Sequence, residues 1–395
     1  MSDTQKHIKP NVPNLRFPGF SGEWKESTFG DCSTGFEYGM NAASKPFDGE
    51  HKYIRITDID ENTSEYKEDG VVSPDSEIDE HYRVNENDIL FARTGASTGK
   101  TYLYSPKDGR LYYAGFLIRM NVSPQNNARF VFYQTQTLRY KKWVQIMSMR
   151  SGQPGINSQE YSSYRCYLPK PEEQQKIADL LTLIDQRISI QNRVIEDLKQ
   201  LKAALCDRLY DESHPNCRIG DIIEQLSVRN KGNIINVLSV SNRYGFISQT
   251  EQFEERSIAS EDTTGYKVVS LNDFAYNPAR INVGSIARLK SIEKGIVSPM
   301  YTCFRCKEGT LPGFLEQFFG TKYFSLEVEK RLEGSVRLCL SFEGLCNIPI
   351  NLPSYSQQKR ISEKLKVVKG KVHLEENYLD VLLNQKQYLL SHLFI

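Results

Sequence analysis

The segment most suggestive of catalysis is the glycine-rich stretch 95–101, GASTGKT, which resembles a phosphate-binding loop. In such a loop four residues separate the two glycines that precede Lys-Ser/Thr, and backbone N–H groups surround the phosphates. Only three residues separate Gly95 from Gly99. The spacing therefore favours a turn between two strands over an ATP site. This turn would present Arg93, Thr94 and Lys100.

A second candidate is a zinc site built from Cys303-x-x-Cys306 with Cys339 and Cys346. The residues around the first pair alternate as in a strand, which directs side chains 303 and 306 to opposite faces. No glycine lies between them to form the tight turn of a zinc knuckle, and the six histidines show no ligand spacing. We predict no metal site.

A DNA methyltransferase acting alone would need an Asn/Asp-Pro-Pro-aromatic segment, and the chain contains no Pro-Pro. Its nearest approach, Asn277-Pro278-Ala279-Arg280, lacks the second proline and the aromatic residue. The stretch Phe17-x-Gly19-x-x-Gly22 is not followed by a helical pattern. We expect no bound S-adenosylmethionine and no catalysis in this chain.

The element that must position any functional loop is the stretch 171–210, which has no glycine and no proline after Pro171. Its apolar residues recur at intervals typical of a coiled-coil seam. A helix of this length with one apolar stripe needs a partner. We place the following residues on the stripe: Ile177, Leu180, Ile184, Ile188, Val194, Leu198, Leu201, Leu205 and Leu209.

The partner helix lies in the same chain, because residues 352–395 repeat the pattern at a constant offset. Leu352-Pro353 repeats Leu168-Pro169, and Gln358 and Ile361 repeat Gln174 and Ile177. The repeat extends into the preceding sequence, so the chain reads globule, helix, globule, helix. Antiparallel pairing would create a pseudo-two-fold axis, as in proteins that read paired DNA half-sites. Parallel pairing is the alternative. The second stripe comprises Ile361, Leu365, Val368, Val372, Leu379, Leu382, Leu389 and Leu393.

Composition is that of an ordinary globular protein, with 39% apolar and 25% charged residues among 395. No apolar run is long enough for a membrane helix, and eight cysteines are too few for a disulfide scaffold. The net charge is only +1, yet residues 58–88 carry a net −10 and residues 89–170 a net +10. Such segregation can create one strongly basic face. Alternatively, the two segments pair with each other on the surface.

Three motifs resemble the DNA-specificity subunit of type I restriction-modification enzymes: PNLRFPGFSGEW, DILFARTGASTGK, and the two helix starts of the form LP-x(4)-Q-x-[KR]-I. The resemblance covers essentially the whole chain. It implies two target-recognition domains that each read half of a split DNA site, separated by helices that set the gap. It also implies two docked modification (methyltransferase) subunits, joined by motor-nuclease subunits. S-adenosylmethionine and ATP with magnesium would bind to those partners.

Under this resemblance, polar and basic residues on turns become candidates for contact with double-stranded DNA, since Arg, Asn and Gln can pair bidentately with guanine or adenine. The first globule offers Arg93, Thr94, Lys100, Arg119, Arg139, Lys141, Lys142, Arg150, Ser151 and Gln153. The second offers Asn242, Arg243, Tyr244, Arg280, Asn282, Arg288 and Arg337. We expect Arg93, Gln153, Arg243 and Asn282 to read bases. Lys141 and Lys142 would contact phosphates or serve solubility.

The predicted fold class is therefore α+β, with two α/β target-recognition globules separated by two long helices paired as an antiparallel coiled coil. The predicted boundaries are a flexible leader (1–14), recognition domain 1 (15–170), helix 1 (171–210), recognition domain 2 (211–353) and helix 2 (354–395). The expected function is non-catalytic recognition of a bipartite DNA site in the cytoplasm. The competing classes are a coiled-coil scaffold without DNA specificity and a nucleotide-hydrolysing enzyme.

Overall fold

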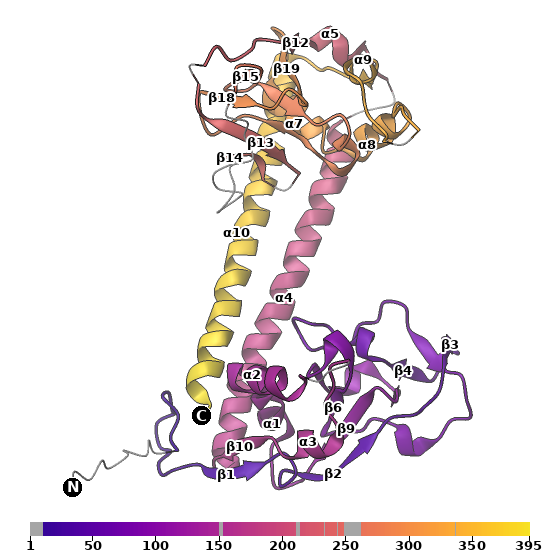
Figure 1. Ribbon diagram of the computed structural model, residues 1–395, viewed down its shortest axis with the longest axis vertical. Helices are drawn as coiled ribbons and strands as arrows, with labels where there is room; N and C mark the ends of the chain where they lie inside the picture. The colour runs from indigo at the N-terminus through magenta and orange to yellow at the C-terminus, as the bar shows by residue number, and fades with distance from the viewer. Residues whose placement is uncertain are drawn as a thin grey trace, which may run out of the picture. The chain divides into compact units, whose positions relative to one another are not determined.

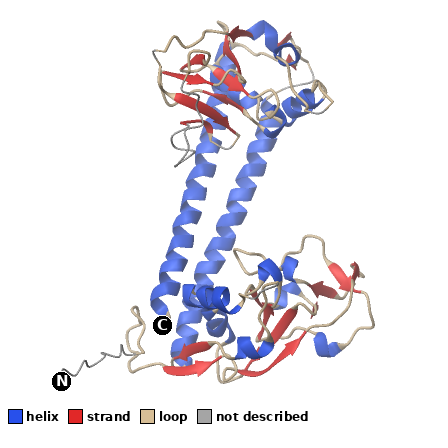
Figure 2. Ribbon diagram, viewed as in Figure 1, coloured by secondary structure: helices blue, strands red, loops and turns tan. Residues whose placement is uncertain are grey.

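The computed structural model describes residues 11–149, 153–210, 214–232, 234–242, 244–248, 262–335 and 337–395. The chain divides into two compact units (Figure 1). Unit 1 comprises residues 1–192 and 377–395, and unit 2 comprises residues 193–376. Each unit combines helices and strands, as Figure 2 shows.

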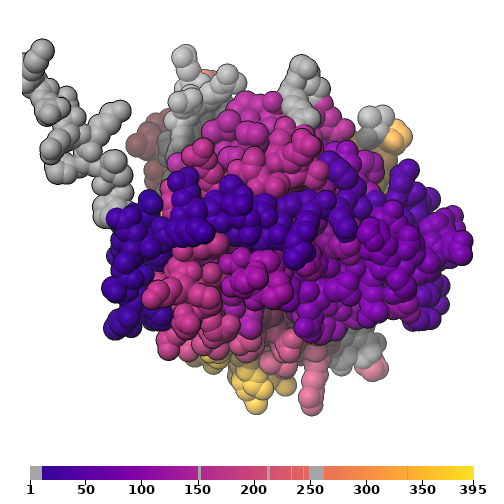
Figure 3. All heavy atoms as spheres, turned by 90° about the horizontal axis from the view of Figure 1, so that it is seen from below, coloured from indigo at the N-terminus to yellow at the C-terminus, as the bar shows by residue number. Residues whose placement is uncertain are grey.

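Unit 1 is built around a four-stranded antiparallel sheet in the order β2-β9-β6-β7. These strands are β2 (Ser33–Tyr38), β9 (Leu117–Val122), β6 (Asp88–Ala92) and β7 (Thr101–Leu103). Three strand pairs accompany the sheet: β1 (Lys25–Thr28) with β10 (Arg165–Leu168), β3 (Ser44–Pro46) with β5 (Val72–Pro74), and β4 (Lys52–Ile54) with β8 (Leu111–Tyr113). In a space-filling view, residues close to the N-terminus (indigo) form a band across this unit (Figure 3).

Strand β6 is buried on both faces of the sheet, which explains its continuous apolar run. Ile89 and Phe91 pack with α1 (Ala128–Gln134) and α2 (Leu138–Met147), whereas Leu90 and Ala92 pack with the short strands. Helix α3 (Ser158–Ser162) and the 3-10 turns η1 (Ile56–Asp58), η2 (Glu80–Tyr82), η3 (Gly95–Ser97) and η4 (Pro106–Asp108) complete the described part of the unit before the long helix.

Unit 2 repeats the central sheet in the order β12-β19-β16-β17. Its strands are β12 (Ile223–Leu226), β19 (Thr302–Cys306), β16 (Phe274–Tyr276) and β17 (Ile286–Arg288). A second sheet has the order β14 (Gly245–Ser248), β13 (Val237–Ser241), β18 (Lys294–Val297) and β15 (Lys267–Ser270), and β11 (Cys217–Arg218) pairs with β20 (Pro349–Ile350). The shorter helical elements are α5 (Ile219–Ile222), α7 (Pro312–Phe318), α8 (Lys322–Glu329), α9 (Phe342–Cys346) and η5 (Ile281–Val283).

The internal repeat is most regular in the positions at which the helices begin. Helices α7, α8 and α9 begin at one and the same offset from α1, α2 and α3 respectively. The long helices α4 (Pro171–Leu209) and α10 (Tyr355–Leu393) both have 39 residues and keep that offset. The predicted repeat of globule and helix is therefore confirmed.

The two long helices pair in antiparallel orientation, as predicted. In unit 1 the buried Ile184 and Ile188 of α4 share a core with Leu382 and Leu389 of α10. In unit 2 Cys206 near the end of α4 shares a core with Leu365 near the start of α10. Two ion pairs follow the same order: Lys386 to Asp185 at 2.7 Å in unit 1, and Lys199 to Glu376 at 2.8 Å in unit 2.

The predicted stripe of α10 is buried or half-buried throughout, but the stripe predicted for α4 is partly wrong. Leu201 is 50% exposed, whereas Ile195 is 6% exposed and faces the partner. In the structure the buried residues of α4 from Ile184 to Ile195 follow one another at alternating intervals of three and four residues, and Gln191 is one of them. A polar residue thus occupies a seam position, and the apolar pattern alone selects Val194 and Leu201, each one residue away from the seam, while Leu198, Leu205 and Leu209 lie on it.

Candidate nucleic-acid interface

Three loops of unit 1 converge where β6 passes into β7. The N–H of Arg93 donates to the Phe116 carbonyl at 3.0 Å, which ties the turn after β6 to the turn before β9. The Arg93 carbonyl accepts from the Ile156 N–H at 2.9 Å, and the Gly95 N–H donates to the Pro154 carbonyl at 2.9 Å. The backbone of the glycine-rich turn is therefore fixed by two neighbouring loops.

The side chain of Arg93 is oriented by an aromatic ring. Its guanidinium carbon lies 4.8 Å from the Tyr38 ring centre, and Nη1 lies 3.5 Å from the Gly115 carbonyl oxygen. The Tyr38 hydroxyl is bonded to the hydroxyl and the N–H of Ser158, both at 3.2 Å, and these bonds lower the pKa of Tyr38. Cation–π contact of this kind fixes the plane of a guanidinium without neutralising its charge.

The glycine-rich segment is a hairpin turn, as predicted, since antiparallel strands β6 and β7 flank it. Gly99 has φ +87°, and a Cβ at this position would lie 2.4 Å from the Val144 side chain. Its N–H donates to the Tyr161 hydroxyl at 3.1 Å. Packing against α2 therefore accounts for this glycine. The helix that must follow a phosphate-binding loop is replaced by strand β7.

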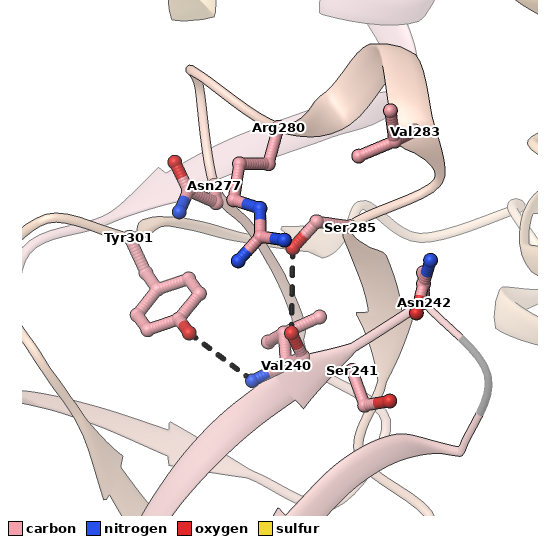
Figure 4. A pocket seen from close by; sticks show the side chains of 8 residues that line it. All are labelled: Val240, Ser241, Asn242, Asn277, Arg280, Val283, Ser285 and Tyr301. Atoms are coloured by element: carbon pink, nitrogen blue, oxygen red, sulfur yellow. Dashed lines mark hydrogen bonds between the residues drawn. The ribbon is translucent and has the colours of Figure 1, made fainter. Parts of the chain in front are cut away.

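Unit 2 builds the same convergence of loops from different side chains. The turn between β16 and β17 contains η5, and the Leu340 N–H donates to the Pro278 carbonyl at 3.0 Å, as Ile156 does to Arg93 in unit 1. Beside this turn lies the end of β13, where Asn242 is 3.7 Å from the position of a Cβ on Gly284. These residues border a hollow of about 140 Å³ (Figure 4).

The structure brings together only part of the predicted contact set. Arg93, Thr94 and Gln153 meet at the unit 1 turn, where Gln153 Nε2 lies 3.2 Å from the position of a Cβ on Gly95. Asn242, Arg280 and Asn282 lie on the adjoining turns of unit 2. Elsewhere on the surface, Lys141 and Lys142 are exposed on α2, Tyr244 on the turn after β13, and Arg337 on the loop before α9. Arg150, Ser151 and Arg243 lie outside the described residues.

Three further side chains that were predicted to contact DNA form ion pairs with carboxylates of their own unit. The Arg119 side chain is 11% exposed, is paired with Glu37, and donates to the Arg83 carbonyl at 2.8 Å. Arg288 is paired with Glu316 at 2.7 Å, and Lys100 with Glu61 at 3.3 Å. A DNA contact by Arg119 or Arg288 would have to break a half-buried ion pair, so this geometry argues against both.

The opposite charges of residues 58–88 and 89–170 are partly matched to one another. Besides Lys100 and Glu61, Lys107 pairs with Glu65 at 2.9 Å, and Arg110 pairs with Glu80. The alternative interpretation, in which the two segments pair on the surface, therefore accounts for part of the segregation. The basic residues 89–170 do not form one uncompensated face.

Some residues at these turns were not singled out by the sequence. Tyr38 and Ser158 support Arg93, and Asn277, Ser285 and Tyr301 line the hollow of unit 2. A further pair is related by the repeat: Phe116 and Met300 are 61% and 58% exposed at equivalent turns. Apolar residues at the same position of both repeats, beside basic turns, are a sequence signal that could have identified this pair.

Cys303 and Cys306 face different sides of β19, as the strand pattern predicts. Cys303 packs in a cluster with Ala275 and Ala287, and Cys306 packs against the cluster that contains Phe274 and Phe304. Burial raises the pKa of each thiol to about 12. The two sulfurs cannot jointly hold one metal ion, and among the described residues no cluster of three His, Cys, Asp or Glu side chains has metal-binding geometry.

The paired helices carry a second apolar surface, outside their seam. On α10, Val367, Leu374, Val381 and Tyr388 are exposed at intervals of seven residues. In an antiparallel pair the flanks that follow this spacing lie on the same side of both helices. Exposed Leu183 and Ile190 of α4 occupy the corresponding flank. We call these six residues the outer stripe.

The opposite flank of the helix pair is polar. It contains the ion pair between Lys199 and Glu376, and in unit 1 the Asp185 carboxylate accepts a hydrogen bond from the Tyr133 hydroxyl at 2.8 Å. In unit 2 the Gln317 carboxamide donates to the Ser362 carbonyl on this flank at 3.1 Å. The globular part of each unit therefore packs on the polar flank, which leaves the outer stripe exposed.

Comparison with known proteins agrees with this architecture. Residues 23–200 match the family model described as the type I restriction modification DNA specificity domain. These residues are a type I specificity domain. The predicted resemblance to the specificity subunits of type I restriction-modification enzymes is confirmed.

Relatives of this specificity domain extend the likeness over most of the chain. The specificity subunit of the type I restriction enzyme MjaVIII from Methanocaldococcus jannaschii is 23% identical over 365 residues, which cover 83% of each chain. The family model and this relative are both named for specificity, in agreement with the prediction of a non-catalytic subunit.

Two solved structures have the same fold as this chain over nearly its whole length. The S subunit of a type I restriction-modification system from M. genitalium superposes with a TM-score of 0.61 at 14% identity, covering 97% of this chain and 99% of that one. A chain from a structure on complex assembly and conformational transition of the type I system gives 0.55 at 15% identity, covering 96% and 98%. Within the described residues, every helix is too short or too polar to cross a membrane.

Proposed function

We propose that the chain is the subunit that selects the DNA site of a type I restriction-modification enzyme, with each unit reading one half of a bipartite site. The observation that carries this proposal is the repeated corner of loops, in which one backbone bond recurs (Ile156 N–H to the Arg93 carbonyl, Leu340 N–H to the Pro278 carbonyl) while the side chains differ. A shared frame with independently varied tips suits the recognition of two unlike half-sites. The boundaries of the two recognition domains would follow the predicted ranges 15–170 and 211–353.

Contacts in the two units would have different roles. Arg93, Gln153, Asn242, Arg280 and Asn282 stand on the convergent turns, from which side chains can reach base edges in the major groove. Lys141, Lys142 and Arg337 are exposed away from these turns and suit phosphate contacts, which position a protein without reading sequence. The helices α4 and α10 would then fix the separation between the two half-sites.

The outer stripe supports a docking role for the helix pair. Apolar side chains spaced seven residues apart are what a further helix needs in order to pack alongside. We assign this surface to helices of two modification (methyltransferase) subunits, through which motor-nuclease subunits would join. S-adenosylmethionine would bind to the methyltransferases, and ATP with magnesium to the motor subunits. A complex acting on cellular DNA would work in the cytoplasm.

The test is methylation mapping of genomic DNA in cells that carry the methyltransferase partner with and without this chain. We expect one bipartite motif whose methylation disappears when the chain is removed. Exchange of the turns 93–100 and 153–157 for those of another specificity subunit should change one half of the motif and leave the other half intact. Methylation that persists without the chain would contradict the proposal and favour a scaffold without DNA specificity.

A further inference from the structure

The hollow of unit 2 is lined by eight residues, and none of them is an aspartate or a glutamate. Figure 4 shows the Arg280 side chain reaching into it, with Asn277, Ser285 and Tyr301 around its guanidinium and Asn242 on the facing wall. No ion pair or side-chain hydrogen bond links Arg280 to any other residue that the structure describes. Its guanidinium donors are therefore left for water or for acceptors of another molecule.

The hydrogen bonds within the hollow leave donors facing inward. The Tyr301 hydroxyl accepts from the Val240 N–H at 3.3 Å, so its own proton remains to be donated. The Asn277 carboxamide oxygen accepts from the Ala279 N–H at 3.1 Å, which leaves its NH₂ group for a ligand. Ser285, by contrast, uses its proton on the Val240 carbonyl at 3.4 Å. The lining therefore presents Arg280, Asn277 and Tyr301 as donors.

The size of the hollow limits what it can accept. A volume of about 140 Å³ is well below the roughly 300–1,000 Å³ of pockets that enclose a whole small ligand. It suits the edge of one base or one phosphate oxygen cluster. Val283 forms an apolar wall beside Arg280, which suits the flat edge of a base better than a hydrated phosphate. Guanine offers two acceptors, N7 and O6, that match the fork of an arginine.

We propose that Arg280 reads a guanine of the DNA half-site recognised by unit 2, by donating two hydrogen bonds to N7 and O6, while Asn277 and Tyr301 position the edge. This inference rests on the proposed function and adds the base and the residue that recognises it. The repeat aligns Arg280 with Gly95 of unit 1, so recognition in that unit falls to Arg93.

The test compares methylation motifs in cells that carry the complete complex with wild-type chain, Arg280→Ala, Arg280→Lys or Arg280→Gln. Wild type should show a guanine at one position of one half-motif. Arg280→Ala should lower discrimination at that position by roughly 10- to 100-fold and leave the other half-motif unchanged. Arg280→Lys should lose discrimination too, because lysine keeps the charge but lacks the fork. Arg280→Gln should shift the preference toward adenine.

Arg229→Ala is the matched control, since this arginine is exposed in the same unit and is absent from the lining of the hollow. An unchanged motif in all three Arg280 variants would overturn the inference. So would a uniform loss of methylation that Arg280→Lys restores, because that result marks a phosphate contact. If Arg280→Ala does not accumulate as folded protein, the lysine and glutamine variants decide. A wild-type chain that confers no motif would overturn the proposed function itself.

Discussion

Gln174 and Gln358, which occupy the same position of the internal repeat, make the same hydrogen bonds in their two units. The Gln174 carboxamide accepts from the Asn127 N–H at 2.9 Å and donates to the Pro169 carbonyl at 3.1 Å. Gln358 accepts from the Leu311 N–H at 2.7 Å and donates to the Pro353 carbonyl at 3.0 Å. Each glutamine thus joins the start of a long helix to the start of a short helix in its own globule.

Substitution of Gln174 by methionine should destabilise unit 1, because the half-buried Asn127 N–H would lose its acceptor. The expected cost is about 1–3 kcal/mol in the free energy of unfolding, measured by urea denaturation. Gln186→Met, at an exposed position of the same helix, is the control and should leave the unfolding midpoint in place. Equal midpoints for the two variants would contradict the structural role of this glutamine.

Replacing Arg93 by alanine should relax one base position in the half-site that unit 1 reads. A lost bidentate contact corresponds to about 1–3 kcal/mol of discrimination, measured by competition with half-site variants. Lys141→Ala provides the contrast: it should weaken binding to all sequences equally and reduce the salt dependence by about one phosphate contact. A uniform effect of Arg93→Ala would reassign this residue to the phosphate backbone.

A charge on the outer stripe should block partner binding without unfolding the chain. We expect Ile190→Glu to weaken association with the methyltransferase subunits at least tenfold, since it places a carboxylate in an apolar helix contact. Titration calorimetry of the purified subunits measures this effect. Asn192→Glu adds the same charge on the polar flank and should bind normally. Normal binding by Ile190→Glu would show that the methyltransferase subunits do not bind the outer stripe.

Lengthening both long helices should lengthen the gap between half-sites. Seven residues inserted after Leu198 in α4, with seven after Glu376 in α10, preserve the heptad register and add about 10 Å of helix. At about 3.4 Å per base pair, the methylated motif should gain about three base pairs of spacing. Four-residue insertions break the register and should abolish methylation. A motif with unchanged spacing after the seven-residue insertions would refute the spacer role.

The buried thiol of Cys303 makes stability depend on pH above neutrality. Burial raises its pKa from 9.0 to about 12, so between these values the folded chain keeps a proton that the unfolded chain has released. The folded state then binds more protons, and the free energy of unfolding must fall as pH rises through this window. Cys303→Ala should make that fall shallower in urea titrations between pH 9 and 11. If the free energy of unfolding fell equally with pH in wild type and variant, the raised pKa of Cys303 would be contradicted.

The long-range architecture was predictable because helical periodicity and the repeat are local properties of the sequence. The register of α4 was not, since Gln191 occupies a seam position where a pattern of apolar residues has a gap. The pattern from 128 to 147 likewise reads as one helix. In the structure α1 ends at Gln134, and Thr137 caps the start of α2 by accepting from the Tyr140 N–H at 3.2 Å.

Site residues were harder to predict than elements, because exposure and pairing depend on tertiary contacts. Arg93 and Arg119 are indistinguishable by residue type, yet Tyr38 directs the first guanidinium while Glu37 neutralises the second. Tyr301 belongs to a strand-like stretch that gave no sign of a hollow beside it. The residue type shows which side chains can contact DNA. Whether such a side chain is exposed and unpaired depends on how the loops pack.

Unit 1 is assembled from two stretches of chain that are separated by the whole of unit 2. Its aromatic core includes Phe394, whose ring lies 5.2 Å from Phe130 and 6.4 Å from Trp24. The core of unit 1 therefore needs residues from both sides of unit 2 along the chain, whereas unit 2 is contiguous and can close before residues 377–395 are made. A chain that ends before residue 377 would leave the core of unit 1 open, because Leu382, Leu389 and Phe394 would be missing from it.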